Sequence, residues 1–117
     1  MEFKDKTIEQ LANNLVVIHG ELEDIFPKYS KAKTDFENLE EWKKNIYFMN
    51  MPDSGTDTHK KKVAETHEAY EAHLQGLCAA REEYNLLMSK KTSLIMKIET
   101  IRTIISAKKE EVRNFGG

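Results

Sequence analysis

The side chains best suited to chemistry are histidines, and their spacing supports neither a metal site nor catalysis. His67-Glu68 begins like the zinc-protease motif H-E-x-x-H, but Glu71 stands where the second histidine must be. Neither His67 nor His73 follows a glutamate by three positions, the spacing that di-iron helix pairs use. The chain also lacks a glycine-rich phosphate loop and a nucleophile elbow. We therefore expect a non-enzyme without catalytic residues, metal or cofactor, in which His73 packs between helices and sets their register.

Basic side chains gather in the last quarter of the chain. Residues 89–117 hold seven Lys and Arg against three Asp and Glu, whereas the whole chain has 18 against 20, a net charge of −2. Such a cluster on a helix is most often a solvated face that aids solubility, and the functional interpretation is a patch that contacts phosphates. A smaller basic run covers residues 60–62. The candidate contacts are Lys90, Lys97, Arg102, Lys108, Lys109 and Arg113.

Aromatic residues beside lysines form a second candidate contact. Trp42, Tyr47 and Phe48 lie close together in the sequence and flank Lys43-Lys44. Aromatic rings interleaved with cations can stack single-stranded bases. Trp42 falls on an apolar stripe, which favours its burial between helices. Tyr47 and Phe48 lie off that stripe and are the better candidates for a surface contact.

Two apolar stripes must position these side chains, and the first predicts a long helix. It covers residues 8–49 with alternating steps of three and four, a heptad pattern with one short step near its end. Thr7 and Gln10 have the spacing of a capping box, so we expect the first helix over about residues 7–50. Pro27 removes one helical hydrogen bond. Because the stripe keeps its phase across Pro27, a kinked helix is favoured over two separate ones.

The second stripe predicts another long helix after a short loop. Residues 50–58 form the one strong turn cluster, and we expect the loop over residues 51–57. The spacing of three and four then continues almost to the C-terminus. It predicts a second helix over about residues 58–113, capped by Asp57 or Thr58.

Together the two helices predict an all-α fold, a single domain over residues 1–117 that forms a long antiparallel, coiled-coil-like helical hairpin. The stripes are wider than one seam can cover. Residue 8 falls opposite about residue 100, which leaves Ile101 and the apolar residues after it beyond the first helix. We therefore expect a homo-oligomer, with a dimeric four-helix bundle as the simplest case. The candidate interface residues are Leu87, Leu94, Ile95, Ile98, Ile101, Ile105 and Val112.

No segment of the sequence predicts a membrane span. The longest fully apolar run, residues 15–18, is far shorter than the ~20 residues that a span needs. The first residues are polar and lack the apolar core of a signal peptide. The single cysteine, Cys78, has no partner for an internal disulfide and is expected to be small and partly packed. We therefore expect a cytoplasmic protein without membrane contact.

Two segments of the second helix resemble a group of phage proteins. They are YEAHLQGLCAAREEYNLL, residues 70–87, and IETIRTIISA, residues 98–107. Both are similar to small helical proteins of bacteriophages that are encoded beside single-strand-annealing recombination genes. The resemblance covers about residues 60–113. It implies a phage accessory protein of DNA recombination or replication in the host cytoplasm, by analogy with mediators that oligomerise and load a recombinase on single-stranded DNA.

Three functions remain open at the level of sequence. The first is an oligomeric helical module that binds single-stranded DNA or a recombinase through the basic residues. The second is a phage inhibitor of a host protein, such as an anti-defence factor, with contacts in the acidic stretch at residues 21–24 and the pairs Glu40-Glu41 and Glu82-Glu83. The third is a structural coiled-coil scaffold with no ligand. The first function predicts DNA binding that weakens with added salt. The second predicts one tight protein partner and no affinity for DNA.

Overall fold

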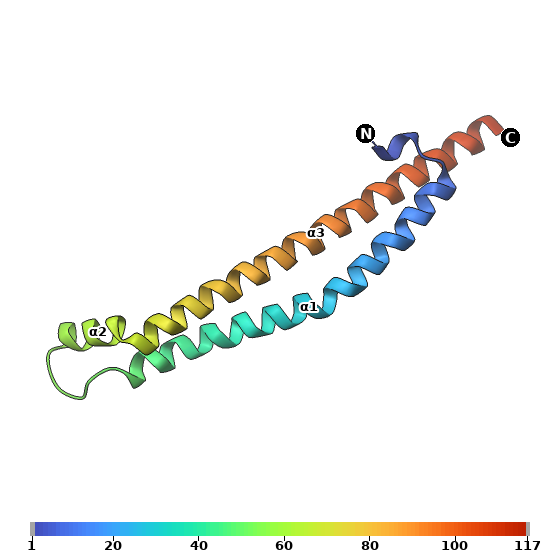
Figure 1. Cartoon of the computed structure of the whole chain (residues 1–117). Helices are drawn as coiled ribbons and strands as arrows, with labels where there is room; N and C mark the ends of the chain where they lie inside the picture. Colours follow the sequence, from blue (N-terminus) through green and yellow to red (C-terminus); the bar gives the residue numbers. More distant parts are fainter. Residues whose placement is uncertain (1, 117) are drawn as a thin grey trace. The chain divides into compact units, whose positions relative to one another are not determined.

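The computed structural model describes residues 2–116, and their regular structure is entirely helical (Figure 1). No strand forms within this range, so the predicted all-α helical hairpin is confirmed. The elements are a short 3₁₀ helix η1 (Glu2–Asp5) and the α-helices α1 (Ile8–Met49), α2 (Asp57–Thr66) and α3 (Glu68–Gly116).

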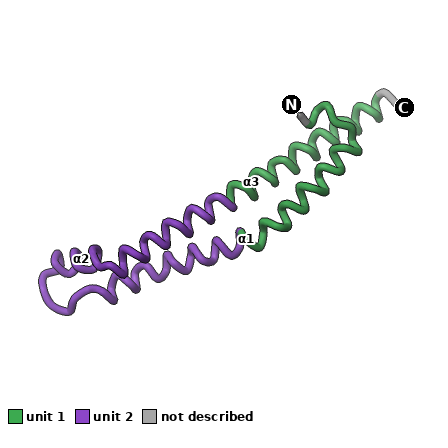
Figure 2. The backbone as a smooth tube through the Cα atoms, in the orientation of Figure 1, with its two compact units in different colours: residues 1–28, 88–117 green, residues 29–87 purple. Residues whose placement is uncertain are grey.

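The chain divides into two compact units (Figure 2). Unit 1 comprises residues 1–28 and 88–117, and unit 2 comprises residues 29–87. Each unit contains a segment of α1 that packs antiparallel on a segment of α3. The boundary in α1 falls directly after Pro27 and Lys28.

The start of α1 is the capping box that the sequence predicts. The Thr7 hydroxyl accepts a hydrogen bond from the Gln10 amide at 3.1 Å, and the Gln10 side-chain oxygen accepts one from the Thr7 amide at 2.9 Å. The helix then continues through Pro27 without a break, as its unbroken apolar phase indicates. It ends at Met49, where the Asn50 side chain donates to the Ile46 carbonyl at 2.8 Å.

The loop between α1 and α2 closes with a different cap from the predicted one. Gly55 has a φ of +115°, a backbone conformation that glycine adopts without steric cost. Thr56, rather than Asp57 or Thr58, is the N-cap of α2, and its hydroxyl accepts a hydrogen bond from the His59 amide at 3.1 Å.

The prediction of one continuous helix over residues 58–113 is wrong at His67. This residue has an extended backbone, with φ −66° and ψ 136°, and separates α2 from α3. Its ring nitrogen Nδ1 accepts a hydrogen bond from the Ala69 amide at 3.1 Å and so caps the start of α3. The Thr66 hydroxyl also donates to the Lys62 carbonyl at 2.7 Å. The His67 bond thus gives the Ala69 amide an acceptor in place of the helical one that the break removes.

Unit 1 has an aliphatic core. Leu11 and Ile101 are fully buried, and Ile18, Leu94 and Ile98 complete the cluster. The expectation that Ile101 lies beyond the first helix is therefore wrong. Leu11 of α1 lies in the same buried cluster as Ile101, so α1 itself reaches this residue. The η1 helix folds back beside α3 (Figure 1) and packs the Phe3 side chain against the cluster, as Ile104 and Ile105 also do.

Unit 2 has an aromatic seam. The Tyr84 ring lies 5.7 Å from the Tyr29 ring and 5.6 Å from the Phe36 ring, measured between centroids. The Arg81 guanidinium lies 5.6 Å from the centroid of Phe36 and forms a 3.3 Å ion pair with Glu40. These contacts join α1 to α3, and each fixes a direction as well as a distance.

A half-buried polar contact completes the seam of unit 2. His73 Nε2 donates a hydrogen bond to the Leu39 carbonyl at 2.7 Å, across the two helices. This confirms the expectation that His73 packs between helices. Because the acceptor is one particular carbonyl, the bond favours a single register of α3 along α1.

Candidate nucleic-acid interface

The predicted cations of α3 lie within unit 1 but do not share one face. Heptad spacing places Lys90 and Lys97 on one side of the buried stripe and Arg102 and Lys109 on the other, since α-helical residues advance about 100° each. All four are exposed. They therefore form two narrow rows separated by the seam, and not one broad basic patch.

The other two predicted cations are less available. Arg113 forms an ion pair with Glu110 on the same helix. Lys108 continues the buried stripe and is half-buried, with its exposed end free to reach solvent. The charge of this end of α3 is therefore partly compensated and divided between two sides.

The structure places the predicted aromatic contacts in unit 2, and it reverses two expectations. Tyr47 is half-buried, and its ring packs edge-on against Tyr70 at 5.5 Å and Phe48 at 5.3 Å. Trp42, expected in the seam, is 55% exposed. Phe48 is 62% exposed, as a surface contact requires. The exposed rings are thus Trp42 and Phe48, and the half-buried Tyr47 ring packs edge-on against Phe48.

The heptad phase explains the position of Trp42. The sequence stripe takes one short step from Leu39 to Trp42, but the helix keeps the regular phase. A step of four from Leu39 leads to Lys43, which is half-buried, and the next seam position is Ile46. Trp42 and Met49, one residue before the seam positions, therefore face solvent, and Met49 is 75% exposed.

The exposed side chains over the last two turns of α1 cover its solvent side, on which Trp42 and Phe48 point about 120° apart, and we call this side the tip surface. Trp42, Asn45 and Met49 follow one another at spacings of three and four residues, so they form one ridge of the helix. Lys44 and Phe48 are four residues apart and form the neighbouring ridge. The tip surface therefore consists of Trp42, Lys44, Asn45, Phe48 and Met49.

The tip surface lies in the basic part of an acidic unit. Residues 42–64 carry five lysines and two aspartates, a net charge of +3. The rest of unit 2, residues 29–41 and 65–87, carries three Lys and Arg against nine Asp and Glu, a net charge of −6. We call this acidic part the stem. Its negative charge directs an anion that approaches unit 2 away from the stem and toward the lysines of residues 42–64.

The Tyr47 hydroxyl is partly desolvated by its neighbours. Loss of solvent raises the pKa of Tyr47 above its usual value of 10.0, and the nearby Glu65 and Tyr70 raise it further. Because a tyrosine is neutral at pH 7 without this shift, the raised pKa reflects the packing of Tyr47 and does not change its charge there.

The predicted oligomer interface is largely used by the chain itself. Its own fold buries Leu87, Leu94, Ile98 and Ile101, so these four side chains belong to the hairpin and offer no free surface. The remaining three predicted residues are Ile95 and Ile105, which are half-buried, and Val112, which is 64% exposed.

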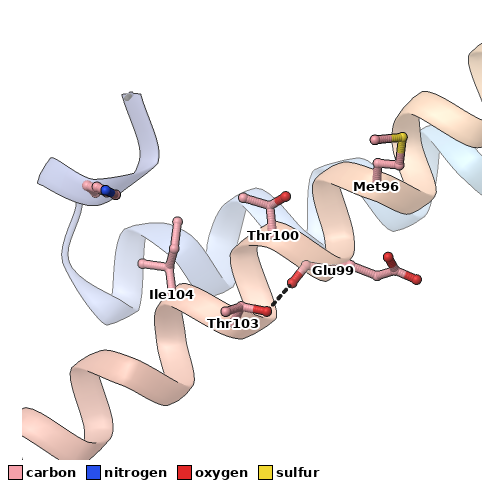
Figure 3. Close-up of a pocket in the computed structure, with 6 residues that line it drawn as sticks. Met96, Glu99, Thr100, Thr103 and Ile104 are labelled. Atoms are coloured by element: carbon pink, nitrogen blue, oxygen red, sulfur yellow. Dashed lines mark hydrogen bonds between the residues drawn. The ribbon is translucent and has the colours of Figure 1, made fainter.

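A small open groove lies between η1 and α3 in unit 1 (Figure 3). It has a volume of about 360 Å³ and is lined by Lys4 and five residues of α3. The Thr103 hydroxyl in this groove donates to the Glu99 carbonyl at 2.9 Å, within the helix (Figure 3). The groove therefore lacks the enclosed apolar walls and convergent polar groups of a small-molecule site. Its lining residues are Lys4, Met96, Glu99, Thr100, Thr103 and Ile104.

Within residues 2–116, no group of three or more His, Cys, Asp or Glu side chains is arranged to hold a metal ion. No helix within the same residues has the length and apolar character that crossing a membrane requires. Cys78, expected to be partly packed, is an exposed free thiol.

Comparisons with known proteins assign no family to this chain. No protein-family model, no curated protein sequence and no solved structure matches it.

Proposed function

We propose that this protein is an oligomeric helical binding module that binds single-stranded DNA through the tip surface, as a phage accessory protein of DNA recombination or replication. The observation that carries the proposal is the exposure of Trp42 and Phe48 beside lysines in the basic part of unit 2. The phage context rests on the resemblance of residues 70–87 and 98–107 to phage helical proteins.

The exposed rings supply the base contacts in this proposal. Every base has a π-face, so stacking on Trp42 and Phe48 requires no particular sequence and contributes about 1–3 kcal/mol per base. Single strands can splay their bases outward, whereas a duplex keeps them stacked on each other. The tip surface is therefore expected to prefer single strands over duplex.

The lysines of residues 42–64 supply the phosphate contacts in this proposal. Lys44 is one helical turn from Phe48, and α2 adds the lysines at residues 60–62. Each phosphate that these lysines neutralise releases counterions, which makes binding salt-dependent with a slope of about −0.7 per contact for a single strand. The separated rows of cations on α3 add general attraction but no aromatic platform.

A second candidate function rests on the acidic stem. Its net charge of −6 suits a basic protein groove that normally holds nucleic acid. In that case the protein acts as an inhibitor of a nucleic-acid-binding partner, and charge reversal at Glu82-Glu83 weakens the complex. Measured affinity of the protein alone for single-stranded DNA separates the two functions.

The direct test is fluorescence anisotropy with a labelled single-stranded oligonucleotide at low salt. We expect Trp42→Ala and Phe48→Ala each to weaken binding by roughly 5- to 100-fold, because each removes one stacking platform. Lys44→Ala should weaken binding less and reduce the salt slope by about 0.7. Duplex DNA of the same sequence should bind more weakly than the single strand.

Two control variants make the result specific to the tip surface. Leu86→Ala removes an apolar side chain of unit 2 that is 52% exposed but lies outside the tip surface, and it should leave affinity unchanged. Lys97→Ala tests the predicted cation rows of α3 and should lower affinity by less than either aromatic variant. Loss of binding in Lys97→Ala with none in Trp42→Ala would place the site on α3 and refute the tip surface.

A further inference from the structure

Unit 1 has two sides of unlike composition. In an antiparallel pair of helices, one row of residues from each helix borders the seam on either side. On one side, which we call the apolar flank, the bordering residues are Ala12, His19, Phe26, Met88, Ile95 and Arg102. On the other side, the charged flank, they are Asn14, Glu21, Lys28, Lys90, Lys97 and Ile104.

Exposed apolar area adds to the apolar flank. Phe26 is 43% exposed, and Val16, next to this row on the outer side of α1, is 72% exposed. Met88 and Ile95 are half-buried by the hairpin, which leaves part of each side chain accessible. Arg102 is the single formally charged side chain in the row. In the outer row that holds Val16, the residues seven positions away are Glu9 and Glu23, so charged side chains limit the apolar area at both ends. An apolar area with such a polar rim is typical of a surface that binds another protein surface.

We propose that a second copy of this chain packs on the apolar flank, so that two copies of unit 1 form a four-helix bundle. Facing helices in such a bundle bury the residues that border each hairpin's own seam. The predicted interface residue Ile95 lies at the centre of the row, between Met88 and Arg102. The buried residues Leu94, Ile98 and Ile101 support this surface from inside the hairpin.

The charge of unit 1 is compatible with a second copy as the partner. Unit 1 holds ten Lys and Arg against nine Asp and Glu, so two copies do not repel each other strongly. A twofold axis near His19 and Ile95 places Arg102 of one copy level with Phe26 and Glu23 of the other. Each copy therefore contributes the cation of one charge pair and the acid of the other, and the same apolar side chains meet across the axis. This is the arrangement that an isologous interface requires.

Two neighbouring valines of α1 provide a matched test. Val16 points toward the apolar flank and Val17 toward the charged flank, because successive residues differ by about 100°. Val17 is 60% exposed, so neither valine is needed for the hairpin core. Val16→Arg places an unpaired charge in the proposed interface, whereas Val17→Arg adds the same charge outside it.

The experiment measures molar mass by light scattering after size exclusion, with circular dichroism to verify that each variant remains helical. The unaltered protein and Val17→Arg should be dimers, and Val16→Arg should raise the dissociation constant about a hundredfold and elute as a monomer. A monomeric unaltered protein would overturn the proposal. So would a dimer that survives Val16→Arg, or one that only Val17→Arg dissociates. Phe26→Glu is a second variant, expected to act as Val16→Arg does.

Discussion

Unit 1 and unit 2 are built from the same pair of helices and are held together by different chemistry. Unit 1 packs Leu, Ile and Phe side chains around the fully buried Leu11 and Ile101. Unit 2 joins α1 to α3 through tyrosine rings, a cation over a ring, and the hydrogen bond from His73 to Leu39. Aliphatic packing stabilises unit 1 mainly through the apolar area that it buries. The ring contacts and the hydrogen bond of unit 2 also require a particular orientation of the side chains that form them.

The difference separates the two proposed tasks. Unit 1 offers an apolar flank that a second copy can bury, and it carries almost equal numbers of acidic and basic residues. Unit 2 offers exposed rings and a separation of charge between the stem and residues 42–64. The oriented contacts between α1 and α3 keep unit 2 rigid, and a surface that stacks bases needs a rigid helix to hold its rings in position.

The largest expected effect is the loss of unit 1. Ile98 is 6% exposed in the aliphatic core, so Ile98→Asp buries a charge without a partner and should cost several kcal/mol of folding free energy. Urea unfolding and peptide-level hydrogen exchange should show protection lost first in residues 8–28 and 88–112. Met96→Asp, at a position that is 60% exposed, is the control and should change neither urea unfolding nor hydrogen exchange appreciably. Equal protection in both variants would show that Ile98 does not belong to the core.

A smaller effect is expected from the polar contact of unit 2. His73→Ala removes the hydrogen bond to the Leu39 carbonyl and should destabilise unit 2 by about 1 kcal/mol. The change should be visible as faster hydrogen exchange in residues 36–47 and 68–80, with unit 1 unaffected. His59→Ala, at an exposed position of α2, is the control. Faster exchange confined to unit 1 would contradict the assignment of this contact.

The smallest expected effect is a difference in alkaline sensitivity. A hydrogen bond with Tyr29, followed by burial, raises the pKa of Tyr84 above 10.0, its value in an unfolded chain. The unfolded state therefore ionises first as pH rises. This contribution to stability is complete below pH 10 and is lost as pH passes through the higher pKa of the folded state.

All four tyrosines lie in unit 2, so tyrosine ionisation weakens that unit alone. Helicity and hydrogen exchange should be followed from neutral pH into the range above pH 10, beside the absorbance of tyrosinate. Tyr84→Phe should make the loss of unit 2 with rising pH less steep. An unchanged pH dependence in this variant would show that Tyr84 does not contribute to it.

The long-range pattern of the fold was predictable from sequence because heptads are a repeated signal. The stripe from residue 8 onward, the Thr7 capping box and the continuity through Pro27 all follow from spacing alone. The break at His67 did not follow, since no Pro or Gly marks it. It depends on local hydrogen bonds of Thr66 and His67 with the backbone, which spacing does not reveal.

The candidate surfaces were less predictable, because a position on a stripe does not fix which side of the helix is buried. Trp42 was assigned to the seam through a single short step, and the regular phase placed it outside. The predicted position of Ile101 beyond the first helix depends on residue 50 lying opposite residue 58. The contacts of Tyr47 with Tyr70 and of Leu39 with His73 instead pair α1 with later residues of α3, because α2 is a separate helix. When the predicted stripe is wrong by one position, a residue that faces solvent is assigned to the core, or the reverse.

The central claim is that single-stranded DNA stacks on the tip surface, and the fluorescence of Trp42 tests it most directly. Trp42 is the single tryptophan of the chain, so its emission reports one site without labelling. Titration with an unlabelled single-stranded oligonucleotide should quench this emission in a saturable way and at the same concentrations that raise anisotropy. Added salt should reverse both signals together. DNA binding by anisotropy with unchanged Trp42 emission would contradict the claim.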